Sequence, residues 1–243
     1  SQSKPDDLKN FKLTSGEAID GAKKKDCRII AYTYTEPVSF YEYIMEVAEF
    51  ARPQKIKNVV ATAGFIKPNP LKKMCKVVDG FAVALKGFDE KYYDKVLGSQ
   101  LKPVLTALET IKGEGKWLEV TSLIVPTYND DMTKIKEMVQ WVKKTLGTKV
   151  PLHFARFFPE YKLKDIPQTP LQTLEQCRDT ALDAGLEFVY LSNVAPHKGN
   201  NTFCPGCKEE VVKRLGFKVL KNDAEKGVCK HCRTKIPGVW EWK

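Results

Sequence analysis

The chain has 243 residues, of which 42% are hydrophobic, and a formal net charge of +10. This length and composition are sufficient for a sizeable buried core, so they exclude an intrinsically disordered polypeptide. No apolar run reaches the roughly eighteen residues of a membrane-spanning helix, and no signal-peptide pattern opens the chain. We therefore expect a cytoplasmic protein. The polar opening from Ser1 to Asn10 has no start-like features, which predicts a processed product or part of a longer polypeptide.

Apolar runs of strand length alternate along the chain with segments of helical period. The predicted strands cover residues 28–34, 58–63, 81–85, 117–125, 151–157 and 187–194. The predicted helices cover residues 40–50, 70–77, 103–112, 132–146 and 171–184. Thr169 and Pro170 predict an N-cap and a first helical position for the last helix.

Repeated strand–helix–strand units predict parallel strands joined by right-handed crossovers. The strands are almost continuously apolar, which predicts burial on both faces of the sheet. The expected fold class is α/β, with a barrel or partial barrel that places functional residues at the carboxyl ends of its strands.

Polar side chains gather at those predicted strand ends. They lie in the segments Thr35-Glu36-Pro37, 86–89, 156–159 and Ser192-Asn193. Two interpretations remain open at this point, because Pro, Gly, Asn and Asp also punctuate ordinary loops between strands and helices.

Near the end of the chain, two Cys-x-x-Cys pairs are separated by about twenty residues. They are formed by Cys204, Cys207, Cys229 and Cys232. Four thiolates at this spacing are typical of a structural zinc ribbon. The alternatives are two disulfides or a redox dithiol, but a redox motif needs only one pair and a disulfide framework normally spreads through a secreted domain.

The remaining cysteines, Cys27, Cys75 and Cys177, are far apart and form no second ligand group in the sequence. We predict two domains, residues 1–196 and residues 197–243, the second being the zinc ribbon. Lysines are concentrated in the tail, but acidic residues are interleaved with them. Nucleic-acid binding by the ribbon therefore remains an alternative to solvated charge.

The motifs resemble a specific family. They are, in chain order, YTYTEPVSFYEY, NVVATAGFI, ALKGFDEKYY, LKPVLTALETIK, WLEVTSLIVPTYNDD, PLHFARFFPEYKL, FVYLSNV, NTFCPGC and CRTKIPGVW. Together they look like the radical S-adenosylmethionine (SAM) protein of the AmmeMemoRadiSam group, a relative of pyruvate formate-lyase activating enzyme. The resemblance runs over nearly the whole chain.

This resemblance implies a partial (β/α) barrel of the radical SAM type, followed by the zinc ribbon. Family members bind a 4Fe-4S cluster through a Cys-x3-Cys-x2-Cys loop and use it to cleave SAM to a 5′-deoxyadenosyl radical. Three thiolates hold such a cluster so that one iron stays free. By the resemblance, that loop precedes Ser1, so the chain begins after the cluster site.

The resemblance also carries over five cofactor-binding positions. Thr35 and Glu36 match the motif that hydrogen-bonds the amino group of SAM. Lys86 matches a lysine at the end of a central strand. Arg156 matches an arginine that pairs with a carboxylate, and Asn193 matches a polar residue at the end of the last strand.

At three positions that the resemblance assigns to the same cavity, the chain departs from the family pattern. Ala84 replaces an Asp, Ala155 a Ser and Phe158 a His. These changes leave two readings open: an enzyme completed by an N-terminal segment, or a cluster-free relative that serves as a zinc-containing scaffold or binding subunit. The implied partners are a Memo-like protein or a protein substrate, and no membrane.

Overall fold

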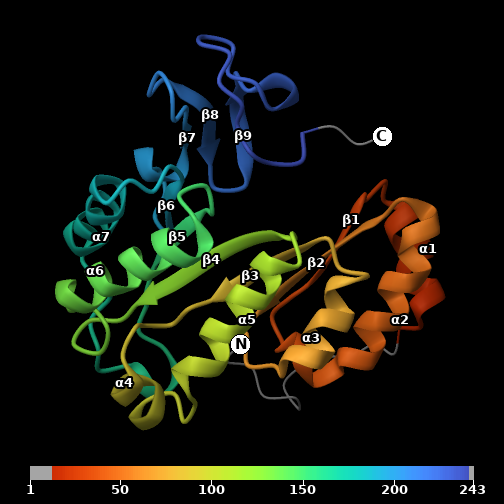
Figure 1. The fold of residues 1–243 in the computed structure, drawn as a ribbon, viewed down its shortest axis with the longest axis horizontal. Coiled ribbons are helices and arrows are strands. Elements are labelled where there is room, and N and C mark those ends of the chain that lie inside the picture. Colours follow the sequence, from red (N-terminus) through yellow and green to blue (C-terminus); the bar gives the residue numbers. More distant parts are fainter. Residues whose placement is uncertain (1–12, 241–243) are drawn as a thin grey trace. The chain divides into compact units, whose positions relative to one another are not determined.

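The computed structural model describes residues 13–240, so the polar opening and the last three residues lie outside the described part. The chain forms two compact units (Figure 1). The first contains Ser1–Ala84 and Lys102–Leu118, and the second contains Leu85–Leu101 and Glu119–Lys243. The predicted boundary between residues 196 and 197 falls inside the second unit and stays a prediction.

The first unit is built on three parallel strands in the order β1-β2-β3. The strands are β1 (Ile29–Tyr32), β2 (Lys57–Thr62) and β3 (Gly80–Ala84). Its helices are α1 (Ser15–Lys24), α2 (Tyr41–Ala51), α3 (Pro68–Cys75) and most of α5 (Leu101–Gly113), with short 3-10 turns at Pro37–Phe40 and Arg52–Gln54.

The second unit contains a further three parallel strands in the order β4-β5-β6. The strands are β4 (Trp117–Ile124), which begins in the first unit, β5 (Leu152–Arg156) and β6 (Val189–Ser192). The helices are α4 (Glu90–Lys95), α6 (Met132–Trp141), which continues as a π-helical turn over Val142–Leu146, and α7 (Leu171–Asp183), preceded by a 3-10 turn at Tyr161–Leu163.

The second unit ends in a small antiparallel sheet with the order β7-β8-β9. The strands are β7 (Thr202–Phe203), β8 (Glu210–Leu215) and β9 (Lys218–Asn222), flanked by 3-10 turns at Lys198–Asn200 and Glu225–Gly227. A two-residue turn joins β8 to β9. Its first residue, Gly216, has a φ of +57°, a conformation that hairpin turns of this length favour and that glycine adopts without strain.

The predicted strands and helices are all present, so the α/β class with parallel strands is confirmed. Two helices were not predicted. The helix α1 buries Ser15, Ile19 and Ala22 at helical spacing, but Ile19 is its one large apolar residue. The helix α4 has only six residues, which is too short for a periodic pattern to show.

The prediction that both faces of the sheet are buried is wrong. Along β2 the burial alternates, with Asn58, Val60 and Thr62 buried and Val59 and Ala61 between them partly exposed. The alternation recurs in β4 and β6. Within each unit one face of the strands is therefore buried and the other is partly open. The prediction failed because the apolar runs contain small residues, which give no sign of which face is covered.

The predicted N-cap role of Thr169 is also wrong. Pro170 occupies the cap position of α7 and no side chain caps the helix. The Thr169 hydroxyl instead donates a hydrogen bond to the Ile124 carbonyl over 2.6 Å and accepts one from the Phe157 N–H over 2.9 Å. It thus joins the ends of β4 and β5.

None of the helices within residues 13–240 is long and apolar enough to cross a membrane.

Candidate functional site

The four ribbon cysteines bring their sulfur atoms together. The Sγ atoms of Cys204 and Cys232 lie 3.5 Å apart, and those of Cys207 and Cys229 lie 3.8 Å apart. All four Sγ atoms lie within 4.8 Å of one another. Four sulfurs at about 2.3 Å from a tetrahedral ion would be separated by about 3.8 Å. The arrangement is therefore a metal-binding site for one ion.

Two matching turns position these sulfurs. The carbonyl of Cys204 accepts from the N–H of Lys208, and the carbonyl of Cys229 accepts from the N–H of Arg233, each over 2.9 Å. Lys208 and Arg233 have positive φ values of +65° and +64°. Each Cys-x-x-Cys pair thus closes on itself with the same backbone geometry, which presents two thiols on one side of each turn.

Gly206 and Thr234 allow the two turns to approach each other. A Cβ atom at Gly206 would lie 2.4 Å from the Thr234 Oγ1 atom, so a larger residue would push the turns apart. The Cys232 Sγ atom lies 3.2 Å from the same hydroxyl oxygen. Hydrogen bonds with the side chain and backbone of Thr234 lower the pKa of the Cys232 thiol to about 6, which favours the thiolate that a metal requires.

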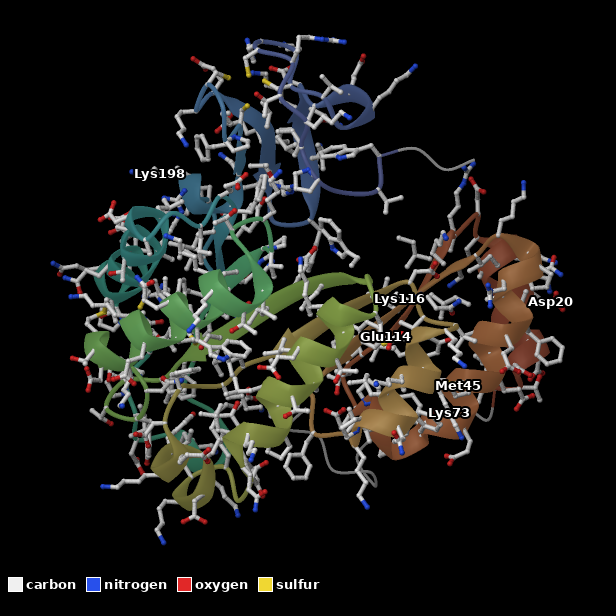
Figure 2. The ribbon with its side chains drawn as sticks, in the orientation of Figure 1. Asp20, Met45, Lys73, Glu114, Lys116 and Lys198 are labelled. Atoms are coloured by element: carbon white, nitrogen blue, oxygen red, sulfur yellow. The ribbon has the colours of Figure 1, made fainter. Side chains whose placement is uncertain are left out.

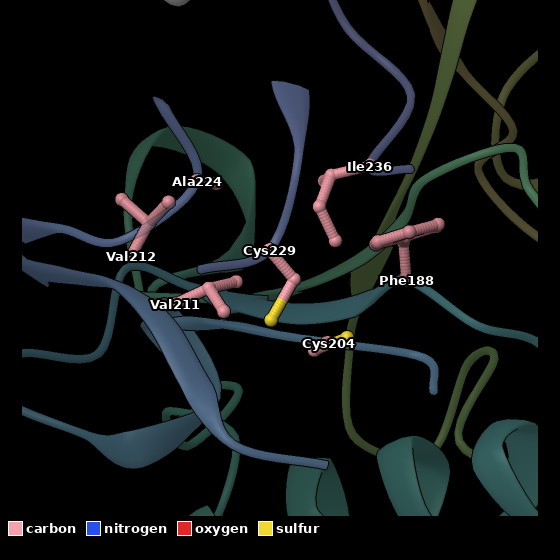
Figure 3. Packing of buried hydrophobic residues seen from close by; sticks show 7 residues of the cluster. All are labelled: Phe188, Cys204, Val211, Val212, Ala224, Cys229 and Ile236. Carbon is pink, nitrogen blue, oxygen red and sulfur yellow. The ribbon is translucent and has the colours of Figure 1, made fainter. Parts of the chain in front are cut away.

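A compact apolar cluster includes two of the four metal ligands (Figure 3). Cys204 and Cys229 are fully buried and pack with Val211, Val212, Ala224, Ile236 and Phe188. Phe188 directly precedes β6, so the ribbon is anchored to the parallel strands of its own unit. Trp240 packs against this cluster and donates its indole N–H to the Ile236 carbonyl.

All seven cysteines are free thiols, so the disulfide alternative is wrong for this structure. Cys75 and Cys177 are buried in α3 and α7, and Cys27 is exposed before β1. Among residues 13–240, the ribbon cysteines form the one group of three or more potential metal ligands. The described thiols therefore do not fit an iron–sulfur cluster in addition to the ribbon ion.

In the first unit, the Glu36 carboxylate is held at the carboxyl end of β2. It accepts hydrogen bonds from the Ala63 N–H over 2.9 Å, from the Val38 N–H over 3.3 Å and from the Thr62 hydroxyl. Thr35 precedes it and is exposed, as is Glu36 itself. The carboxylate of this exposed residue thereby fixes the loop after β1 to the end of β2.

In the second unit, Arg156 and Asn193 are brought together. The Asn193 side chain donates to the Arg156 carbonyl over 3.0 Å, and the Arg156 Nε–H donates to the Thr169 carbonyl over 2.8 Å. The guanidinium group lies 5.7 Å from the centre of the Phe158 ring. Lys86 is exposed, and its N–H donates to the Tyr93 hydroxyl oxygen.

Asn129 is a positioning residue that sequence reasoning missed. Its side chain is buried, donates to the carbonyls of Lys86 over 2.5 Å and Leu123 over 2.8 Å, and accepts from the Val125 N–H. It therefore joins the segment after β3 to the end of β4. The only signal in the sequence was its place in the polar segment that follows a predicted strand.

The three departures from the family pattern lie at the ends of strands. Ala84 is the last residue of β3 and is partly exposed, while Ala155 in β5 is 6% exposed. Phe158 is 49% exposed and covers Arg156. No hydroxyl, carboxylate or imidazole is supplied at these three positions.

No protein-family profile matches this sequence. The uncharacterized protein MJ0808 of Methanocaldococcus jannaschii is 40% identical over 238 residues, which cover 97% of this chain and 71% of that protein. The benzylsuccinate synthase activating enzyme of Thauera aromatica is 26% identical over 110 residues, which cover 45% of this chain and 33% of that enzyme.

Solved structures of radical SAM proteins share the fold. A domain of a pyruvate-formate lyase-activating enzyme from Bacteroides vulgatus matches with a TM-score of 0.59 at 13% identity, covering 68% of this chain and 98% of that domain. Streptococcus suis SuiB bound to SAM matches with a TM-score of 0.62 at 15% identity, covering 77% of this chain and 45% of SuiB. The expected radical SAM type of fold is thus confirmed, and the chain belongs to the same protein family as MJ0808.

Proposed function

We propose that this chain is the SAM-binding and zinc-binding part of a radical SAM protein that acts on a protein or peptide substrate. The observation that carries the proposal is the shared fold with radical SAM proteins, one of which was solved with SAM bound. The weaker similarity to an activating enzyme supports it. The resemblance to the AmmeMemoRadiSam group adds a Memo-like protein as the proposed partner.

In this proposal, the residues at the strand ends bind SAM. The Glu36 carboxylate accepts from the ammonium group, and Thr35 lies beside it. Arg156 pairs with a carboxylate of the cofactor or substrate, while Asn193 fixes the Arg156 backbone. Lys86 supplies a further cation at a strand end.

The ribbon ion is proposed to be zinc with a structural role. Four cysteine ligands fill all positions of a tetrahedral zinc ion and leave none for a reactant. The described thiols do not fit an iron–sulfur cluster, so the proposed enzyme takes its cluster cysteines from residues outside residues 13–240.

A cluster-free scaffold or binding subunit is the second candidate. The geometry of Glu36 favours it, since three donors of the first unit already occupy this carboxylate. The alanines at positions 84 and 155 also favour it, because they offer no polar group to a cofactor.

The test uses the complete polypeptide that contains this sequence, purified without oxygen. The enzyme proposal predicts bound iron and sulfide, SAM binding, and formation of 5′-deoxyadenosine after reduction. It also predicts that Glu36→Gln weakens SAM binding about tenfold, because a charge-assisted hydrogen bond is lost. An iron-free preparation that contains zinc and does not bind SAM would establish the scaffold instead.

A further inference from the structure

A cavity of about 490 Å³ lies in the second unit, beside the first cysteine turn of the ribbon. Its walls come from α7, from the turn at residues 185–187 and from residues 203–208. Lys198, labelled in Figure 2, also lines it from the segment that connects β6 to the ribbon. The volume falls within the range of small-molecule sites, about 300–1,000 Å³.

Arg178 of α7 is the unusual residue in this cavity. Its side chain is only 12% exposed, and burial lowers the pKa of the guanidinium group. The Nε–H donates to the Val189 carbonyl over 3.2 Å, and the nearest carboxylate oxygen, from the exposed Asp179, is 3.9 Å away. A buried cation with such weak pairing is costly unless an anion compensates it.

The other charged groups of the cavity favour an anion. Lys198 and Lys208 line it and are both exposed. The acidic residues in the lining are Asp183 and Glu187, and Glu187 already accepts a hydrogen bond from the Thr148 hydroxyl over 2.7 Å. Three cations and two carboxylates thus surround the cavity.

Apolar side chains form the rest of the wall. Leu182 and Leu186 line the cavity from the α7 side, and Phe203 and Pro205 from the ribbon side. The Phe203 ring lies 6.0 Å from the Arg178 guanidinium carbon. The lining therefore suits a ligand that combines a strongly anionic group with a small apolar body.

We propose that this cavity binds a phosphate monoester such as a nucleoside monophosphate, with the phosphate paired to Arg178 and Lys198 or Lys208. A guanidinium fork matches phosphate geometry, and the volume accommodates one nucleoside but not a chain of nucleotides. The phosphate would come either from a free nucleotide or from the 5′ end of a nucleic acid. The site is independent of the strand ends that are proposed to bind SAM.

The first experiment is calorimetric titration of the zinc-loaded protein with AMP, adenosine and inorganic phosphate at matched ionic strength. AMP binds with a stoichiometry of one, and adenosine binds at least about tenfold more weakly because it lacks the charge-assisted contacts. Arg178→Met weakens AMP binding about tenfold or more, and at least one of Lys198→Met and Lys208→Met weakens it as well. The control Lys218→Met, on exposed β9 of the same unit, leaves AMP binding unchanged.

Thermal unfolding separates ligand binding from a structural role of Arg178. AMP raises the midpoint of the wild type but not that of Arg178→Met, since only a ligand of the native state shifts the equilibrium. Without ligand, Arg178→Met is at least as stable as the wild type, because a poorly compensated buried charge has been removed. AMP also slows amide exchange at the end of α7 and at residues 203–208 in the wild type, a result that needs no variant.

Oligonucleotides distinguish the two sources of phosphate. Displacement of AMP by a 5′-phosphorylated oligonucleotide, but not by the unphosphorylated one, assigns the site to nucleic-acid ends. Failure of both to displace AMP assigns it to free nucleotides. The proposal is overturned if the wild type binds neither AMP nor phosphate, if Arg178→Met binds AMP as tightly, or if the unphosphorylated strand competes equally well.

Discussion

Burial decides which thiols of this protein can react. Cys75 and Cys177 are enclosed in their helices, and desolvation raises the pKa of Cys75 to about 11 and that of Cys177 to about 12. Thiolates are the nucleophilic form, so both side chains are inert near neutral pH. Cys27 is exposed in the segment between α1 and β1.

Iodoacetamide should therefore label Cys27 in the native, zinc-loaded protein and spare Cys75 and Cys177, as measured by peptide mass spectrometry at pH 8. Unfolding in urea should make all three reactive. The raised pKa values of Cys75 and Cys177 have a second consequence, since burial favours the neutral thiol: the stabilising contribution of these two thiols is present below pH 9 and is lost as the pH rises towards 11 and 12. Equal labelling of Cys177 and Cys27 in the native protein would contradict this assignment.

Asn129 carries a second prediction at the residue scale. Asn129→Ala leaves the Lys86 and Leu123 carbonyls and the Val125 N–H without their partner. Unfolding in urea should show a loss of about 3 kcal/mol, because unpaired buried backbone groups are costly. The exposed Asn69 is the matched control, and Asn69→Ala should change the free energy of unfolding little. Equal effects of the two changes would rule out the bridging role.

The metal ligands were predictable from the sequence because the spacing of two Cys-x-x-Cys pairs encodes a tetrahedral site. The roles of Asn129 and Thr169 were not predictable. Each side chain contacts strand ends that are distant in the sequence, such as Lys86 for Asn129 and Ile124 for Thr169. Polar residues after a strand have the same appearance in the sequence whether they bind a ligand, cap a helix or connect two strands.

At the scale of elements, α1 shows how local chemistry can define a helix that has one large apolar residue, Ile19. Thr14 accepts a hydrogen bond from the Glu17 N–H, and the Glu17 carboxylate accepts from the Thr14 N–H over 2.8 Å. This reciprocal pair is a capping box. The sequence signal Thr-x-x-Glu was present, whereas the several large apolar residues that identified the other long helices were not.

Loss of the Thr14 cap should destabilise α1 selectively. Thr14→Ala should accelerate hydrogen exchange of the α1 amides about fivefold, which corresponds to about 1 kcal/mol, while Thr14→Ser should leave it nearly unchanged. The Thr14 N–H and the Thr14 hydroxyl both lower the pKa of Glu17, and Thr14→Ala removes only the hydroxyl. The part of the wild type's advantage that comes from this hydroxyl is therefore present above pH 4.5 and disappears as the pH falls through the lower pKa of the folded state. Exchange in Thr14→Ala that matches the wild type at neutral pH would show that the cap contributes nothing.

At the scale of the whole molecule, the alternation of strands and helices was sufficient to predict six parallel strands. The burial of one face only was not predictable, because residues such as Ala61 and Ala82 are apolar whether they are covered or open. The division into two compact units was also not visible, since the second unit includes the segment Leu85–Leu101 from the middle of the first unit's sequence.

Removal of the metal should affect the ribbon and leave the first unit folded. The buried cluster around Cys204 and Cys229 includes the metal ligands, so repulsion between thiolates and loss of the ion should open β7, β8 and β9. Hydrogen exchange in the presence of a strong chelator should rise in these strands and stay unchanged in β1, β2 and β3. Uniform loss of protection in both units would contradict the separate stability of the first unit.

Metal analysis of the 243-residue chain tests the central claim most directly. The protein is reconstituted anaerobically with zinc, iron and sulfide, desalted, and assayed for each element and for 5′-deoxyadenosine after addition of SAM and reductant. The account predicts one zinc ion per chain, no stoichiometric iron or sulfide, and no turnover. Stoichiometric iron and sulfide together with 5′-deoxyadenosine would contradict it.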